Sequence, residues 1–172
     1  MEDIKIILGD IVYPKTEVII IPGNVVGLMN RGVAKYILKD GLGGIKKEVE
    51  TIAKENILEV GKCFKTGPGR LNRRGIKQIY HAVLKHFPNE ITSLDTLEKT
   101  LKYTLNKVLE DNWKSVAISG MGFEEGDLDK KSVANIFFSI SEKLNSKIEI
   151  KIIDFDKEFI EELEKIEKRT KE

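Results

Sequence analysis

A polar segment separates an apolar run from a helix-like pattern near the start of the chain. Asn24 follows the run "VIIIPG", and Gly32 begins the pattern that continues through Ala34 and Ile37. An Asn amide both donates and accepts hydrogen bonds, which suits ribose hydroxyls. Glycine lets the backbone come close to a phosphate, and the N–H groups of a helix N-terminus favour an anion. The segment is therefore either a phosphate and ribose site or an ordinary strand-to-helix loop.

The first turn of the chain carries a second candidate. Gly9, Asp10 and Ile11 directly follow the apolar run "IKIIL". A carboxylate fixed there can accept a hydrogen bond from an exocyclic amine such as that of adenine. The alternative interpretation is that Asp10 only satisfies backbone amides of its own turn.

A glycine-rich segment, "SGMGFEEGD" at 119–127, lies between a strand pattern and a capped helix pattern. Repeated glycines at such a place indicate a backbone-lined anion site. Glu124 and Glu125 oppose that interpretation, because a carboxylate within about 5 Å of a diphosphate costs ~1 kcal/mol or more unless it is solvated.

The stretch 62–77 is basic and contains no acid, although the net charge of the whole chain is only +1. It could contact the phosphates of RNA, or it could be a solvated hairpin with its turn at Gly67-Pro68-Gly69. Its cations are Lys62, Lys65, Arg70, Arg73, Arg74 and Lys77. His81 and Cys63 have no partners at catalytic or metal-binding spacing, so we interpret both as structural.

Strand patterns alternate with amphipathic helix patterns along the whole chain. This alternation predicts an α/β fold with a mostly parallel sheet and helices on both faces. Ligands of such sheets bind at the carboxyl ends of strands, here after residues 8, 21 and 118. The strands are expected at 4–8, 18–21, 76–84, 115–118 and 148–153, and N-caps at Thr92 or Ser93, Asp129 and Asp156.

Composition limits the class of protein. The 172 residues, 41% hydrophobic and 33% charged, are typical of one globular domain spanning 1–172. No apolar run approaches the roughly 20 residues of a membrane span, and no signal peptide pattern begins the chain. We therefore expect a cytoplasmic protein with no membrane partner. The single cysteine predicts neither a disulfide nor a metal cluster.

Taken in order, these segments resemble the macro domain family of ADP-ribose-binding modules. "LGDI" is similar to the opening strand and turn of the family. "EVIIIPGNVVGLMNRGVAKYI" resembles D-A-I-V-N-A-A-N followed by G-G-G-V-A-x-A-I, and "GKCFKTGPGRLNRRGIKQIYHAV" resembles the G-x-C…T-x-G-x-L…I-H-x-V segment. "SVAISGMGFEEGD" and "IIDFDKEF" correspond to the phosphate loop and to the last strand with its aromatic residue.

The resemblance implies a three-layer α/β/α fold and a set of ligand contacts. Asp10 and Ile11 would bind adenine, Phe155 would stack on it, and Asn24 would meet the distal ribose and hold the attacking water in a hydrolytic member. Gly32 and Val33 would offer backbone to the diphosphate, with Arg31 pairing with a phosphate. The opposite side of the phosphates would be closed by Ser119, Gly120, Met121, Gly122, Phe123 and Gly126.

The sequence also departs from the family pattern inside this site. Ile21 replaces the first Asn of N-A-A-N, and Asn30 and Arg31 replace two glycines. Ala34 stands where the best-known hydrolytic branch has an Asp. The resemblance therefore implies binding of free ADP-ribose or of mono-ADP-ribosylated protein without a cofactor, and leaves hydrolysis of ADP-ribosyl or O-acetyl-ADP-ribose bonds open. A degenerate fold that binds RNA or another protein is the alternative.

Overall fold

Six strands form one mixed sheet in the computed structural model, which describes residues 4–13, 15–41, 43–124 and 127–172. The strand order is β1-β6-β5-β2-β4-β3, and every neighbouring pair is parallel except the antiparallel β3–β4 pair. The bounds are β1 Lys5–Leu8, β2 Val18–Asn24, β3 Cys63–Thr66, β4 Gln78–Lys85, β5 Ser115–Ile118 and β6 Glu149–Asp154. The predicted α/β class and mostly parallel sheet are confirmed.

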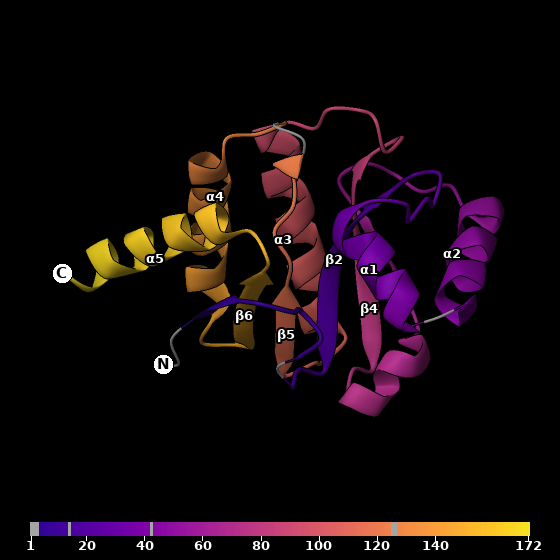
Figure 1. Ribbon diagram of the computed structural model, residues 1–172, viewed down its shortest axis with the longest axis horizontal. Coiled ribbons are helices and arrows are strands. Elements are labelled where there is room, and N and C mark those ends of the chain that lie inside the picture. The colour runs from indigo at the N-terminus through magenta and orange to yellow at the C-terminus, as the bar shows by residue number, and fades with distance from the viewer. Residues whose placement is uncertain (1–3, 14, 42, 125–126) are drawn as a thin grey trace.

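The sheet is covered on both faces because its central strands are apolar on both faces. Val18 and Ile20 of β2 pack into one core cluster, and Ile19 and Ile21 pack into the other. The first cluster is completed by α3 Leu94–Glu110, α4 Lys130–Leu144 and α5 Lys157–Lys171. The second is completed by α1 Gly32–Gly41, α2 Gly43–Glu55 and the 3-10 helix η1 Gly69–Arg74. Figure 1 shows α1 and α2 on the side of β4, and α4 and α5 on the side of β6.

Three helices begin at the residues that the sequence indicates. The side chains of Ser93, Asp129 and Asp156 accept hydrogen bonds from the backbone N–H groups of Thr96, Ser132 and Phe159. These contacts satisfy amides that the first helical turn leaves without an intrahelical acceptor. Between the two candidate caps of α3, the structure selects Ser93.

The region 60–78 contains more structure than the basic loop expected from the sequence. Cys63–Thr66 forms the edge strand β3, paired with β4, and the connection between them includes η1. This connection closes at Gly75, whose φ of +89° favours glycine. The predicted hairpin is present, with a helical turn inserted between its strands, and contact with RNA stays a prediction. β2 also continues past the predicted end at Ile21, through a register shift at Gly23 and Asn24.

The parallel strands bring their carboxyl ends to one edge of the sheet. β1, β2, β5 and β6 end there at Leu8, Asn24, Ile118 and Asp154, so the segments that follow them lie close together. In the part of the chain that the structure describes, none of the helices combines the length and apolar character of a membrane span.

Candidate functional site

Two adjoining hollows form a cleft at the carboxyl edge of the sheet. The first hollow has a volume of about 590 Å³ and lies between the β1–β2 turn, the start of α1, the β5–α4 loop and the end of β6. The second has a volume of about 250 Å³ and lies between the β2–α1 loop and the end of β4. Gly32, Val33 and Glu124 line both hollows. One elongated ligand could therefore extend across the N-terminus of α1.

The cleft brings together eight of the thirteen predicted contact residues. The first hollow is lined by Ile11, Gly32, Val33, Gly120, Phe123 and Phe155, and the second by Asn24, Arg31, Gly32 and Val33. Asp10, Ser119, Met121 and Gly122 are absent from both linings. Gly126 lies outside the described residues. The individual ligand contacts assigned to all these residues stay predictions.

Asp10 binds groups of its own chain. Its Oδ1 accepts a hydrogen bond from the Val12 backbone N–H at 2.9 Å, and its Oδ2 accepts one from the Tyr36 hydroxyl. Tyr36 lines the first hollow and packs edge-on against Phe155, with ring centroids 5.8 Å apart. Asp10 thus satisfies a turn amide, as the alternative interpretation expects, and also positions an aromatic ring of the first hollow.

The Asn24 side chain stabilises the loop that follows β2 through two hydrogen bonds. Its Nδ2 donates to the Leu28 carbonyl at 2.8 Å, and its Oδ1 accepts from the Leu28 N–H at 3.0 Å. Further along this loop, Gly32 begins α1 with a φ of +54°, and a Cβ added there would meet no atom within 4 Å. The backbone at the start of α1 therefore faces open space, as a phosphate site requires.

Two backbone N–H groups of the β5–α4 loop already donate hydrogen bonds to carboxylates of the chain. The Gly120 N–H donates to Asp154 Oδ1 at 3.1 Å, and the Gly122 N–H donates to Glu124 Oε2 at 2.9 Å. Burial raises the pKa of both carboxyl groups. A Cβ on Gly120 would lie 2.8 Å from the Phe123 ring, so Gly120 is required by packing.

A partly buried ion pair contributes Lys85 to the wall of the second hollow. Lys85 Nζ lies 2.7 Å from Asp127 Oδ2, and the two side chains are 15% and 13% exposed. Lys85 itself lines the second hollow. Sequence reasoning missed Lys85, Asp154 and Tyr36. The signal for the first two was available, since Lys85 ends β4 and Asp154 ends β6 at the edge where ligands bind.

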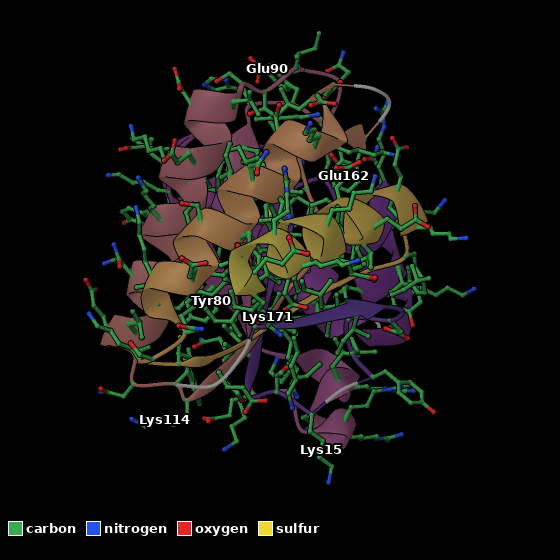
Figure 2. The ribbon with its side chains drawn as sticks, turned by 90° about the vertical axis from the view of Figure 1, so that its left-hand side faces the viewer. Lys15, Tyr80, Glu90, Lys114, Glu162 and Lys171 are labelled. Atoms are coloured by element: carbon green, nitrogen blue, oxygen red, sulfur yellow. The ribbon has the colours of Figure 1, made fainter. Side chains whose placement is uncertain are left out.

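Most of the basic stretch lies at the opposite edge of the sheet. Figure 2 shows Glu90, in the loop after β4, at the top, and Lys15 and Lys114, which precede β2 and β5, at the bottom. η1 precedes β4, and the Lys77 N–H donates to the Glu17 carbonyl at 2.7 Å, so the part of the stretch from η1 to Lys77 belongs to the bottom edge. The start of the stretch lies nearer the other edge, because the Lys62 carbonyl accepts from the Val83 N–H close to the carboxyl end of β4. Lys62 and Lys65 pair with Glu59 and Asp111.

His81 and Cys63 are absent from the linings of both hollows, although His81 lies directly behind Gly23 of the second hollow. His81 is buried, its ring stacks on Phe64 with centroids 4.4 Å apart, and its Nε2 lies 2.9 Å from Thr66 Oγ1. Burial lowers the pKa of His81 to about 3. Across the described ranges, no three His, Cys, Asp or Glu side chains are grouped so that they could hold a metal ion.

Comparison with known proteins assigns the chain to a family. The model of the family described as "Macro domain" matches residues 22–137. The chain belongs to the macro domain family. It is 33% identical to an uncharacterized protein of Aquifex aeolicus (strain VF5) over 166 residues, which cover 95% of this chain and 97% of the relative.

Solved macrodomains share the fold. The macrodomain of Mycobacterium tuberculosis DarG superposes with a TM-score of 0.78 at 24% identity, covering 88% of this chain and 97% of that one. A variant of the Oceanobacillus iheyensis macrodomain solved with ADPR gives a TM-score of 0.81 at 16% identity, covering 96% and 92%. The matched macro domain region of this chain contains Asn24, Gly32 and Glu124, whereas Asp10 and Phe155 lie outside it.

Proposed function

We propose that this macro domain binds ADP-ribose, free or attached to protein, in the cleft at the carboxyl edge. The observation that carries the proposal is the joining of two hollows at Gly32 and Val33, where the backbone of α1 begins beside open space. A diphosphate is an anion that suits a helix N-terminus, with a nucleoside on one side and a ribose on the other. The ADPR bound by the Oceanobacillus iheyensis variant supports this choice of ligand.

The hollows differ in a way that orients the ligand. The first is the larger, and Phe155 and Tyr36 offer aromatic rings to a base. Stacking on an aromatic ring contributes ~1–3 kcal/mol by analogy with single-strand binders. The second hollow is smaller, and Asn24, Arg31 and Lys85 in its wall offer polar groups to ribose hydroxyls. Adenine would therefore occupy the first hollow and the distal ribose the second.

A matched pair of glycine substitutions tests the proposal. Gly32 and Gly75 both have positive φ, and a Cβ added at either meets no atom within 4 Å, but only Gly32 lines the cleft. Aspartate tolerates this backbone conformation, and it adds one negative charge at either position. Gly32→Asp should weaken ADP-ribose binding by at least about tenfold in calorimetric titration, because its carboxylate repels the diphosphate.

Gly75→Asp is the control and should leave the affinity unchanged. AMP and adenosine titrated in parallel should lose progressively less affinity to Gly32→Asp, since each carries less phosphate than ADP-ribose. Absence of heat with the unmodified protein at millimolar ADP-ribose would contradict the proposal.

Hydrolysis of an ADP-ribosyl ester is a second candidate function, favoured by the Lys85–Asp127 pair beside the second hollow. Transfer of the Lys85 proton to Asp127 leaves an amine that can attack the anomeric carbon of the distal ribose. A bond from Nζ to that carbon forms while the bond to the departing carboxylate breaks. The ring then opens to an imine, and water releases ADP-ribose and restores the amine.

The chemistry of this second function has a direct readout. Borohydride added during turnover of a mono-ADP-ribosylated protein should reduce the imine and attach ADP-ribose to Lys85, which mass spectrometry of peptides detects. Lys85→Arg should abolish both release and attachment while keeping the positive charge. Release by Lys85→Arg at the unmodified rate would remove Lys85 from the reaction. Asn24→Ala tests the role that the resemblance gives to Asn24.

Binding of RNA is a further alternative, supported by the exposure of Arg70, Arg73 and Arg74 in η1 and of Lys77 at the edge opposite the cleft. A filter-binding assay should then show affinity that falls steeply with salt and is lost when Arg73 and Arg74 become Glu. Binding with a flat salt dependence would speak against this surface.

A further inference from the structure

Glu124 is an anion of the protein itself, and it lies where the two hollows of the cleft meet. Its Oε2 accepts the Gly122 N–H of the β5–α4 loop at 2.9 Å. By the resemblance to macro domains, this loop would close over the phosphates of the ligand. A backbone amide that could face a phosphate is thus held by a carboxylate of the chain.

Charged groups of both signs surround Glu124. Lys85, a cation of the second hollow whose charge acts on Glu124, is paired with Asp127 at 2.7 Å. Lys130, in the wall of the first hollow, pairs with Asp156 and Glu158 at 2.9 and 3.2 Å. The Asp154 carboxylate at the end of β6 adds a second negative charge, and Arg31 lines the second hollow. Burial, opposed by the Gly122 and Lys85 interactions, raises the pKa of Glu124 above its ordinary value.

We infer that Glu124 competes with the diphosphate of the ligand for the β5–α4 loop, so that binding of ADP-ribose is coupled to the uptake of one proton. This inference rests on the proposed function and adds a pH dependence to it. The ionised carboxylate occupies the Gly122 amide and repels a diphosphate beside Gly32 and Val33. The protonated form has no charge to repel the ligand, and its weaker hydrogen bond yields the amide to a phosphate oxygen.

The direction of the effect follows from linkage. An anionic ligand raises the pKa of Glu124 further, because it disfavours the charged form of a neighbouring acid. The complex then holds more protons than the free protein at every pH between the two pKa values. Affinity therefore increases as the pH falls through that window, by up to about tenfold per pH unit for one coupled proton. Above and below the window the affinity no longer changes with pH through Glu124, although above it the ionised carboxylate still weakens binding.

Calorimetric titration of the full chain with ADP-ribose, from about pH 5 to about pH 8, tests the coupling between ligand binding and proton uptake. The lower limit lies near the ordinary pKa of a carboxyl group, so the range covers the values above it. Titrations in two buffers of different ionisation heat report the number of protons taken up. The wild-type protein should bind more tightly as the pH falls and should take up a fraction of a proton that approaches one. Adenosine, which has no phosphate, should bind without this dependence.

Glu124→Gln copies the shape and the neutrality of the protonated side chain. It should bind ADP-ribose more tightly than the wild-type protein at about pH 8 and should show no proton uptake from this position. Glu158→Gln is the matched control, because it removes one exposed acid beside Lys130 outside both hollows. Glu158→Gln should keep the wild-type pH response, and thermal melting checks that both variants fold.

The possible results separate this inference from the proposed function. Tight binding of ADP-ribose that is independent of pH, or a pH dependence that persists in Glu124→Gln, overturns the competition and leaves the proposed function standing. An absence of ADP-ribose binding at every pH removes both.

Discussion

The β3–β4 side of the sheet and the cleft each hold a titratable side chain whose pKa is displaced by burial, but their surroundings differ. His81 is enclosed by Phe64 and Thr66, and burial accounts for the whole shift of its pKa to about 3. Glu124 borders two hollows and has Lys85 and Asp154 as charged neighbours. An enclosed side chain such as His81 keeps one protonation state. The protonation state of Glu124, which borders an open cleft with charged neighbours, can change when a ligand binds.

We therefore expect the region around His81 to govern the stability of the fold and the cleft to govern ligand binding. Substitutions around His81 should change the free energy of unfolding and leave the cleft intact. Substitutions of residues that line the cleft should change ligand affinity at a smaller cost in stability.

The largest effect is expected from Phe64→Ala. Phe64 is 8% exposed and stacks on His81, so its removal leaves a cavity beside an edge strand. Loss of a buried Phe side chain costs about 3–5 kcal/mol in the free energy of unfolding, which urea denaturation measures. Ile57→Ala, at a side chain that is 93% exposed, is the control and should change stability little. A large loss of ADP-ribose affinity in folded Phe64→Ala would show that the two regions are coupled.

The second largest effect is expected from acid, which should lower the free energy of unfolding through His81. The folded-state pKa of His81 is lowered from 6.5 to about 3, so the unfolded chain binds a proton at this position before the folded protein does. The stability that comes from keeping His81 neutral is complete above the unfolded pKa and is lost as the pH falls through the interval toward the folded pKa. The loss approaches about 1.4 kcal/mol per pH unit.

Urea denaturation from about pH 7 to about pH 5 measures this slope. His81→Phe, which cannot take up a proton, should remove the His81 contribution and keep a ring stacked on Phe64. Equal pH slopes in the two proteins would mean that His81 is not the group that titrates.

Sequence reasoning located the fold better than the contacts within the site. The apolar run of β2 and the caps Asp129 and Asp156 depend on neighbours in the sequence, and both are confirmed. Edge strand β3 was missed because four residues, "CFKT", give too short an alternation to distinguish a strand from a loop.

The contacts of the site depend on residues that are distant in the sequence. Lys85 and Asp127 are 42 positions apart, and Tyr36 reaches Asp10 across 26 positions. No local pattern predicts such pairs, because the sheet topology brings them together. Glu124 could be recognised as an objection to phosphate binding, but its bond to the Gly122 amide became visible only with the loop conformation.

The smallest effect is expected at Asp10, where it decides between two roles of one carboxylate. Asp10→Asn keeps the size of the side chain but offers one acceptor in place of two for the Val12 amide and the Tyr36 hydroxyl. If Asp10 acts through Tyr36, then Tyr36→Phe alone should weaken adenosine binding by about as much, near 1 kcal/mol. Adding Asp10→Asn to Tyr36→Phe should then cost little more, because the shared interaction is already lost. If the Asp10 carboxylate instead accepts a hydrogen bond directly from the adenine amine, the losses of affinity should add in the double variant. Calorimetric titration with adenosine distinguishes the two roles.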